Sequence, residues 1–163
     1  MGTSRKTLIL AVGNPLREDD GISAVVLDEL TLRIPPEAPV DLMDAGTAGL
    51  DCALFWDGYE KLILIDAADM GLEPGQWRRF ALEEMNLDEN GLRSIGAVHA
   101  AGLNEALVLG RALGNLPPEV IIFGIQPETI RFGMGISSSL MDSLPSLCEA
   151  VVQTLNLELS IDT

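Results

Sequence analysis

The sequence of 163 residues contains few of the side chains that cross-link a chain or bind metals through sulfur. Its only cysteines are Cys52 and Cys148, and no CxxC pair occurs. It therefore supplies neither a disulfide framework nor a thiolate metal site. We expect both thiols to fill the core, on helices. The chain has a single histidine, His99, so any metal or catalytic site has only one imidazole to use.

Long apolar runs are also missing. No stretch approaches the roughly 20 apolar residues that a membrane-spanning helix needs. The run from Leu8 to Val12 is too short for the core of a signal peptide. We therefore predict a cytoplasmic protein that has no membrane partner.

Basic residues are few as well. The chain has 10 Lys and Arg against 25 Asp and Glu, which gives a formal net charge of −15 at pH 7. Such a charge repels phosphate backbones and anionic lipids and favours cationic partners or metal ions. A nucleic-acid partner is therefore not expected, and an acidic surface that only keeps the protein in solution would explain the same charge.

The apolar residues, 47% of the chain, alternate between strand-like and helix-like segments. We predict one compact domain over residues 1–163 with a three-layer α/β/α fold and a mostly parallel sheet. The segment Gln76 to Phe80 is expected to return beside the third strand as an antiparallel edge, and Leu82 to Gly96 is expected to be loop. The other expected strands are Thr7 to Val12, Val40 to Met43, Lys61 to Ile65 and Val120 to Ile125, and the expected helices are Ile22 to Leu32, Leu50 to Trp56, His99 to Leu113 and Leu140 to Leu157.

Acidic residues follow two of the predicted strands, where α/β folds bind their ligands. Asp19 and Asp20 follow the first strand, Asp66 follows the third, and His99 opens a later helix. Each has a structural explanation: Asp20 can cap a helix, Asp66 can close a turn, and an isolated His99 can belong to a helix start. Two carboxylates with one imidazole are, in combination, a donor set suited to nickel, zinc, iron or manganese.

Other chemistries are less well supported. The glycine-containing loop after the first strand carries Glu18, Asp19 and Asp20, which would repel phosphates, and no GxGxxG or Walker pattern is present. No GxSxG elbow is found, and the serines of 137–139 have no base nearby in the sequence. A Cys52 and His99 pair has no supporting motif, so an inert buried thiol is favoured.

Several motifs resemble those of the NiFe-hydrogenase maturation endopeptidases. Residues 13–21, GNPLREDDG, resemble the GNxLxxD(D/E)G signature of that family. Residues 44–49, DAGTAG, resemble its DGGTxG turn, with Ala45 in place of a glycine. Residues 65–67 resemble its acidic third-strand motif, His99 falls at its loop histidine, and residues 124–128, GIQPE, resemble its GIxPE segment. The resemblance runs over nearly the whole chain.

The resemblance implies a fold and a function. The sheet would have five strands in the order 2-1-3-5-4, with one antiparallel strand. Asp20, Asp66 and His99 would be the nickel ligands, with Asp20 shorter by one methylene than the Glu of other members. The enzyme would be an endopeptidase that removes the C-terminal tail of a nickel-loaded hydrogenase large-subunit precursor, and the substrate would supply the nickel.

Within that reading, either Asp20 or Asp66 would be the catalytic base. Residues on the strand-end loops would bind the substrate peptide, with turn stabilisation as the alternative for each: Asn14, Gly46, Thr47 and Gln126. Two other functions remain open at this point. One is a nickel-binding or nickel-sensing maturation factor that cuts nothing, and the other is a metallopeptidase that uses its own metal.

Overall fold

The sheet has five strands in the order β2-β1-β3-β5-β4. The computed structural model describes residues 7–84 and 103–155. Four strands run parallel: β1 (Thr7–Val12), β2 (Val40–Gly46), β3 (Lys61–Ala67) and β5 (Glu119–Ile125). The fifth, β4 (Trp77–Ala81), pairs antiparallel with β5 at the edge. This confirms the predicted fold class and strand order.

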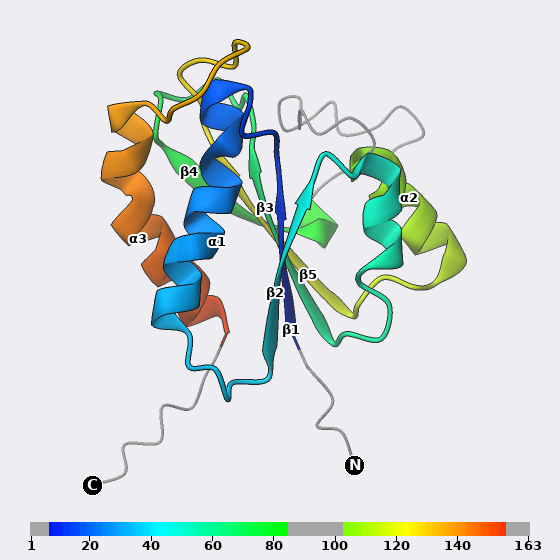
Figure 1. The fold of residues 1–163 in the computed structure, drawn as a ribbon. Helices are drawn as coiled ribbons and strands as arrows, with labels where there is room; N and C mark the ends of the chain where they lie inside the picture. Colours follow the sequence, from blue (N-terminus) through cyan, green and yellow to red (C-terminus); the bar gives the residue numbers. More distant parts are fainter. Residues whose placement is uncertain (1–6, 85–102, 156–163) are drawn as a thin grey trace, which may run out of the picture.

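Helices cover both faces of the sheet (Figure 1). One face carries α1 (Ile22–Arg33) and α3 (Ser138–Thr154), and the other carries η2 (Gly49–Leu54) and α2 (Leu103–Leu113). Two short 3₁₀ turns complete the described elements, η1 (Glu18–Gly21) and η3 (Leu82–Glu84). No helix within 7–84 and 103–155 has the length and apolar character needed to cross a membrane.

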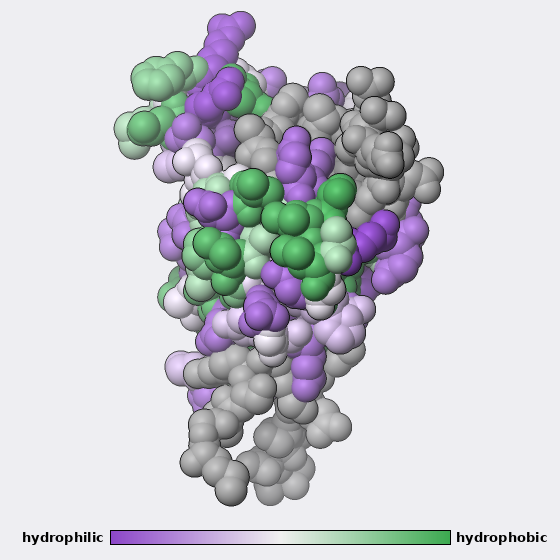
Figure 2. All heavy atoms as spheres, turned by 90° about the vertical axis from the view of Figure 1, so that its right-hand side faces the viewer, coloured by the Kyte–Doolittle hydropathy of each residue, from purple (hydrophilic) through white to green (hydrophobic). Residues whose placement is uncertain are grey.

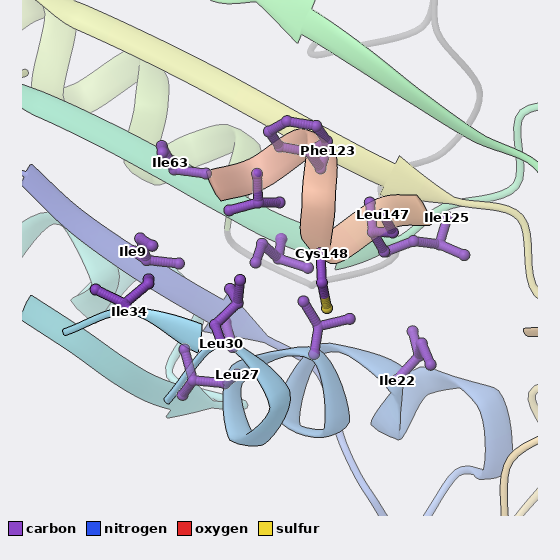
Figure 3. Packing of buried hydrophobic residues seen from close by; sticks show 14 of the residues in the cluster. Ile9, Ile22, Leu27, Leu30, Ile34, Ile63, Phe123, Ile125, Leu147 and Cys148 are labelled. Atoms are coloured by element: carbon purple, nitrogen blue, oxygen red, sulfur yellow. The ribbon is translucent and has the colours of Figure 1, made fainter. Parts of the chain in front are cut away.

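The core has two layers, one on each face of the sheet, because the parallel strands are buried on both faces. Side chains alternate along β1, so Ile9 faces α1 and α3 while Leu8 and Leu10 face η2 and α2. Figure 3 shows the first of these layers, in which Ile9, Ile63 and Phe123 pack against residues of α1 and α3. Continuous apolar runs in β1, β3 and β5 follow from this double burial.

Three sequence-based expectations need correction. The antiparallel edge strand pairs with β5 and not with the third strand, because β1 and β5 already occupy both edges of β3. The expected helix from Leu50 to Trp56 is the shorter 3₁₀ helix η2, and η3 interrupts the start of the expected loop from Leu82. The remainder of that loop, His99 and the last residues of the closing helix prediction lie outside the described residues.

Both cysteines fill the core, as predicted. Cys52 lies on η2 and Cys148 on α3, and both are fully buried free thiols. Burial raises the pKa of each thiol to about 11, and the negative charges of Asp66 and Asp51 contribute to the shift at Cys52. Neither thiol is ionised at neutral pH, which removes Cys52 as a nucleophile.

Candidate active site

The candidate site lies at the carboxyl ends of β1 and β3, which are neighbours in the sheet. Asp66 is almost fully buried near the end of β3 and stands in register with Val12, the last residue of β1. After β1 the chain turns and enters η1, which carries Asp20 and contacts β3. Asp20 and Asp66 are therefore presented by two contacting elements, η1 and β3, at the carboxyl ends of the parallel strands.

Gly13 allows the tight turn that returns η1 over the strand end. A Cβ added at Gly13 would collide with the backbone oxygen of Asp20, so only glycine fits there. The Asp20 carboxylate accepts a hydrogen bond from the Asn14 N–H at 2.8 Å through Oδ2. It does not cap a helix, because α1 begins after Gly21 without any side-chain cap. The capping explanation for Asp20 is thereby removed.

Asp19 has the opposite role, although it is the adjacent residue. It is fully buried, and its Oδ1 accepts the Ser137 N–H at 2.7 Å. Its Oδ2 accepts the Ser137 hydroxyl at 2.8 Å and the N–H groups of Glu128 and Thr129 at 2.9 and 3.1 Å. Burial by itself would raise the pKa of Asp19, but these donors outweigh it and hold the pKa below its ordinary 3.8. Asp19 is thus an ionised latch between η1 and the segment that follows β5.

The predicted substrate-binding residues divide into two groups. Asn14 lies in the loop after β1, Gly46 is the last residue of β2, and Thr47 follows it, all at the same strand ends as Asp20. The Asn14 Oδ1 accepts the Leu16 N–H at 3.0 Å, and the Gly46 carbonyl accepts the Gly13 N–H at 2.9 Å. Gly46 has a φ of +53°, which suits glycine, and Thr47 is exposed. A peptide laid across these strand ends would meet all three residues.

Gln126 belongs to the second group because it is buried and points into the fold. Its Oε1 accepts the N–H groups of Met70 and Leu72 at 2.7 and 3.2 Å, and its Nε2 donates to the Asp69 Oδ1 at 3.2 Å. The side chain therefore holds the loop between β3 and β4 in place. A peptide contact by Gln126 stays a prediction.

His99 lies outside the residues that the structure describes. Within 7–84 and 103–155, no group of three His, Cys, Asp or Glu side chains is arranged to hold a metal ion. Asp20 and Asp66 are thus the part of the expected ligand set whose placement is known. Sequence reasoning missed Thr129 and Ser137, whose N–H groups donate hydrogen bonds to Asp19. The only signal for them in the sequence was the acidic pair Asp19 and Asp20 in the loop after β1.

Known proteins match this chain in sequence and in fold. A model of the family described as hydrogenase maturation protease, HycI, matches residues 25–154. The chain belongs to the hydrogenase maturation proteases. Members of this family are peptidases, so the protein is a hydrolase, and the resemblance of its motifs is confirmed at the level of the family.

Individual relatives agree with the family. The hydrogenase expression/formation protein HupM of Azotobacter chroococcum mcd 1 is 31% identical, over 92% of this chain and 72% of its own. The hydrogenase 2 maturation protease of Escherichia coli K12 is 26% identical, over 92% of this chain and 90% of its own. The structure of the E. coli hydrogenase maturating endopeptidase HybD superposes with a TM-score of 0.77 at 26% identity, covering 92% and 91% of the two chains.

Proposed function

We propose that this maturation protease removes the C-terminal extension of a NiFe-hydrogenase large-subunit precursor once nickel has been loaded, and that it recognises the nickel of its substrate. The observation that supports this is the placement of Asp20 and Asp66 on contacting elements at the carboxyl ends of β1 and β3. Family membership supplies the peptidase activity. The proposal places the reaction in the cytoplasm, away from membranes and nucleic acids.

The donor set argues for a metal that arrives with the substrate. Asp20, Asp66 and, as we propose, His99 offer two carboxylates and one imidazole. Sites that retain a catalytic metal usually bring more nitrogen or sulfur ligands. Both cysteines are buried and protonated, so neither adds a thiolate. The three groups would instead complete the coordination of a nickel ion that the precursor already holds.

Each residue of the site then has a task. The two carboxylates and His99 bind the substrate's nickel, which acts as a Lewis acid on the scissile carbonyl or on a water molecule. Asp20 or Asp66 takes the proton of the attacking water as general base. Asn14, Gly46 and Thr47 hold the peptide by hydrogen bonds from the strand-end loops. The Asp19 latch keeps η1, and with it Asp20, in position.

Precursor processing tests the proposal directly. Purified enzyme is incubated with nickel-loaded and nickel-free large-subunit precursor, and the products are weighed by mass spectrometry. We expect the loaded form to lose its tail without added metal and the nickel-free form to remain intact. Asp66→Asn and His99→Ala should abolish processing, and His99→Ala should shift the free energy of unfolding by no more than about 0.5 kcal/mol.

The exposed Asp28→Asn on α1 is the matched control and should process normally. Two outcomes would favour other functions. Cleavage of nickel-free precursor at a comparable rate indicates a metallopeptidase with its own metal. Nickel binding without loss of the tail indicates a binding or sensing factor. Unfolding of His99→Ala would show that this histidine stabilises the core.

A further inference from the structure

The segment of residues 129–136, which we call the arm, joins β5 to α3 beside the candidate site. In Figure 1 the connection between these two elements rises above the carboxyl ends of the strands. The base of the arm is fixed to η1, where Thr129 Oγ1 donates to Glu18 Oε2 at 2.7 Å and the Thr129 N–H donates to Asp19. The arm is therefore attached to the same turn that carries Asp20.

The middle of the arm is also hydrogen-bonded to the loop after β1. The Gly133 N–H donates to the Leu16 carbonyl at 2.8 Å, and the Gly133 carbonyl accepts the Glu18 N–H at 3.0 Å. These two bonds form a short parallel bridge between Arg17 and Gly133. Backbone pairing of this kind fixes the direction in which the neighbouring side chains project.

The residues on either side of Gly133 project into solvent. Phe132 is 88% exposed and Met134 is 82% exposed. Figure 2 shows apolar side chains protruding at the upper edge of the molecule, apart from the apolar surface over η2 and α2. An exposed aromatic ring beside an exposed methionine, both on a tethered backbone, is typical of an anchor that becomes buried in a partner.

The charges beside the arm indicate the chemistry of that partner. Arg131 precedes Phe132, and Arg17 faces Gly133 across the bridge. Both arginines are exposed, and neither forms a salt bridge with another residue of the described part of the chain. The Glu18 carboxylate also lies beside Gly133, but it is only partly exposed and accepts the Thr129 hydroxyl. On a protein of net charge −15, the exposed charges at this end of the arm are therefore those of the two arginines. This end of the arm complements an apolar pocket that is bordered by carboxylates.

We infer that the arm is the substrate-docking element of this protease, and that Phe132 and Met134 insert into an apolar, acid-rimmed pocket on the precursor protein. The inference rests on the proposed function. A precursor whose scissile bond reaches Asp20 comes close to the loop of residues 16–20, which carries Asp20, and the arm is bonded to that loop. The arm contacts the body of the precursor, while the carboxylates act on the nickel and the tail.

The double variant Phe132→Ser/Met134→Ser tests the inference against a matched control. Leu54→Ser/Leu113→Ser removes two side chains that are 77% and 66% exposed on the η2 and α2 face. Burial of a single large apolar side chain corresponds to a factor of about 10 to 100 in affinity. We expect the arm variant to lose about tenfold or more in kcat/KM for nickel-loaded precursor, mainly through KM, and the control to stay within about twofold.

Direct binding keeps this test separate from the proposed function. The Kd of immobilised, nickel-loaded precursor is measured for the wild type and both double variants, together with thermal melts and solution masses. If the wild type binds but does not cut, the proposed function fails, while a higher Kd for the arm variant still supports docking. An arm variant with wild-type Kd and kcat/KM would overturn the inference. So would a fall in solution mass from dimer to monomer, because the arm would then bind a second copy of this chain.

Discussion

Two adjacent aspartates have different surroundings because they lie on a 3₁₀ turn. Successive side chains of such a turn project about 120° apart. Asp19 therefore points into the protein and accepts four hydrogen bonds, while Asp20 points back over the end of β1 toward Asn14. The Asp19 carboxylate fixes the turn, and the neighbouring Asp20 carboxylate lies at the strand end, where we propose that it binds the substrate's nickel.

Asp19→Asn should destabilise the fold by about 2 to 3 kcal/mol at neutral pH, because a charged acceptor is lost and an amide N–H₂ would face N–H donors. The folded-state pKa of Asp19 lies below 3.8, so its stabilisation is fully present above the unfolded pKa. It is lost as the pH falls through the folded pKa. Urea unfolding should therefore show the difference between wild type and variant shrinking below about pH 4. Asp20→Asn is the control, and an equal loss of stability there would contradict the latch.

At the scale of elements, sequence patterns predicted what is determined locally and missed what depends on distant pairing. Buried apolar runs identified β1, β3 and β5, and the rule of strand ends selected Asp20 and Asp66. The prediction that β4 pairs with the third strand was wrong, because the residue pattern of an edge strand does not indicate which strand it pairs with. The role of Asp19 was not predictable, since Ser137 lies 118 positions away along the chain.

The central strand should carry more of the stability than the site. Leu64 is fully buried in β3, between β1 and β5 and beneath η2 and α2. Leu64→Ala removes buried methyl groups and leaves a cavity, so we expect a loss of about 2 to 5 kcal/mol in the free energy of unfolding. Denaturant titration measures it, with exposed Leu54→Ala as a control that should change by no more than about 0.5 kcal/mol. A loss below about 1 kcal/mol for Leu64→Ala would mean that the core refills around the gap.

At the scale of the whole molecule, the helices cover the two faces of the sheet, and the candidate site lies at the carboxyl ends of its strands. The carboxyl ends of β1, β2 and β3 lie side by side (Figure 1). Asn14 lies in the loop after β1, Gly46 is the last residue of β2, and Asp66 lies near the end of β3. The arm is bonded to the loop after β1. A precursor docked on the arm would therefore approach the carboxylates from the side of β5 and α3, and cleavage would depend on both contacts at once.

The charge of the molecule leads to a prediction about salt. With a net charge of −15, like charges repel one another across the folded surface, while only two salt bridges, Arg33–Glu29 and Lys61–Glu119, join residues of the described part. Raising the ionic strength from about 0.01 M to about 0.15 M shortens the screening length from about 30 Å to about 8 Å. Repulsion is weakened more than the few attractions, so the melting temperature at neutral pH should rise with sodium chloride.

Near the sequence pI of about 4.2 the net charge vanishes, and the same salt step should change the melting temperature little. Scanning calorimetry at both pH values measures the effect, and a melting temperature that falls with salt at neutral pH would show that attractive pairs outweigh the excess of carboxylates.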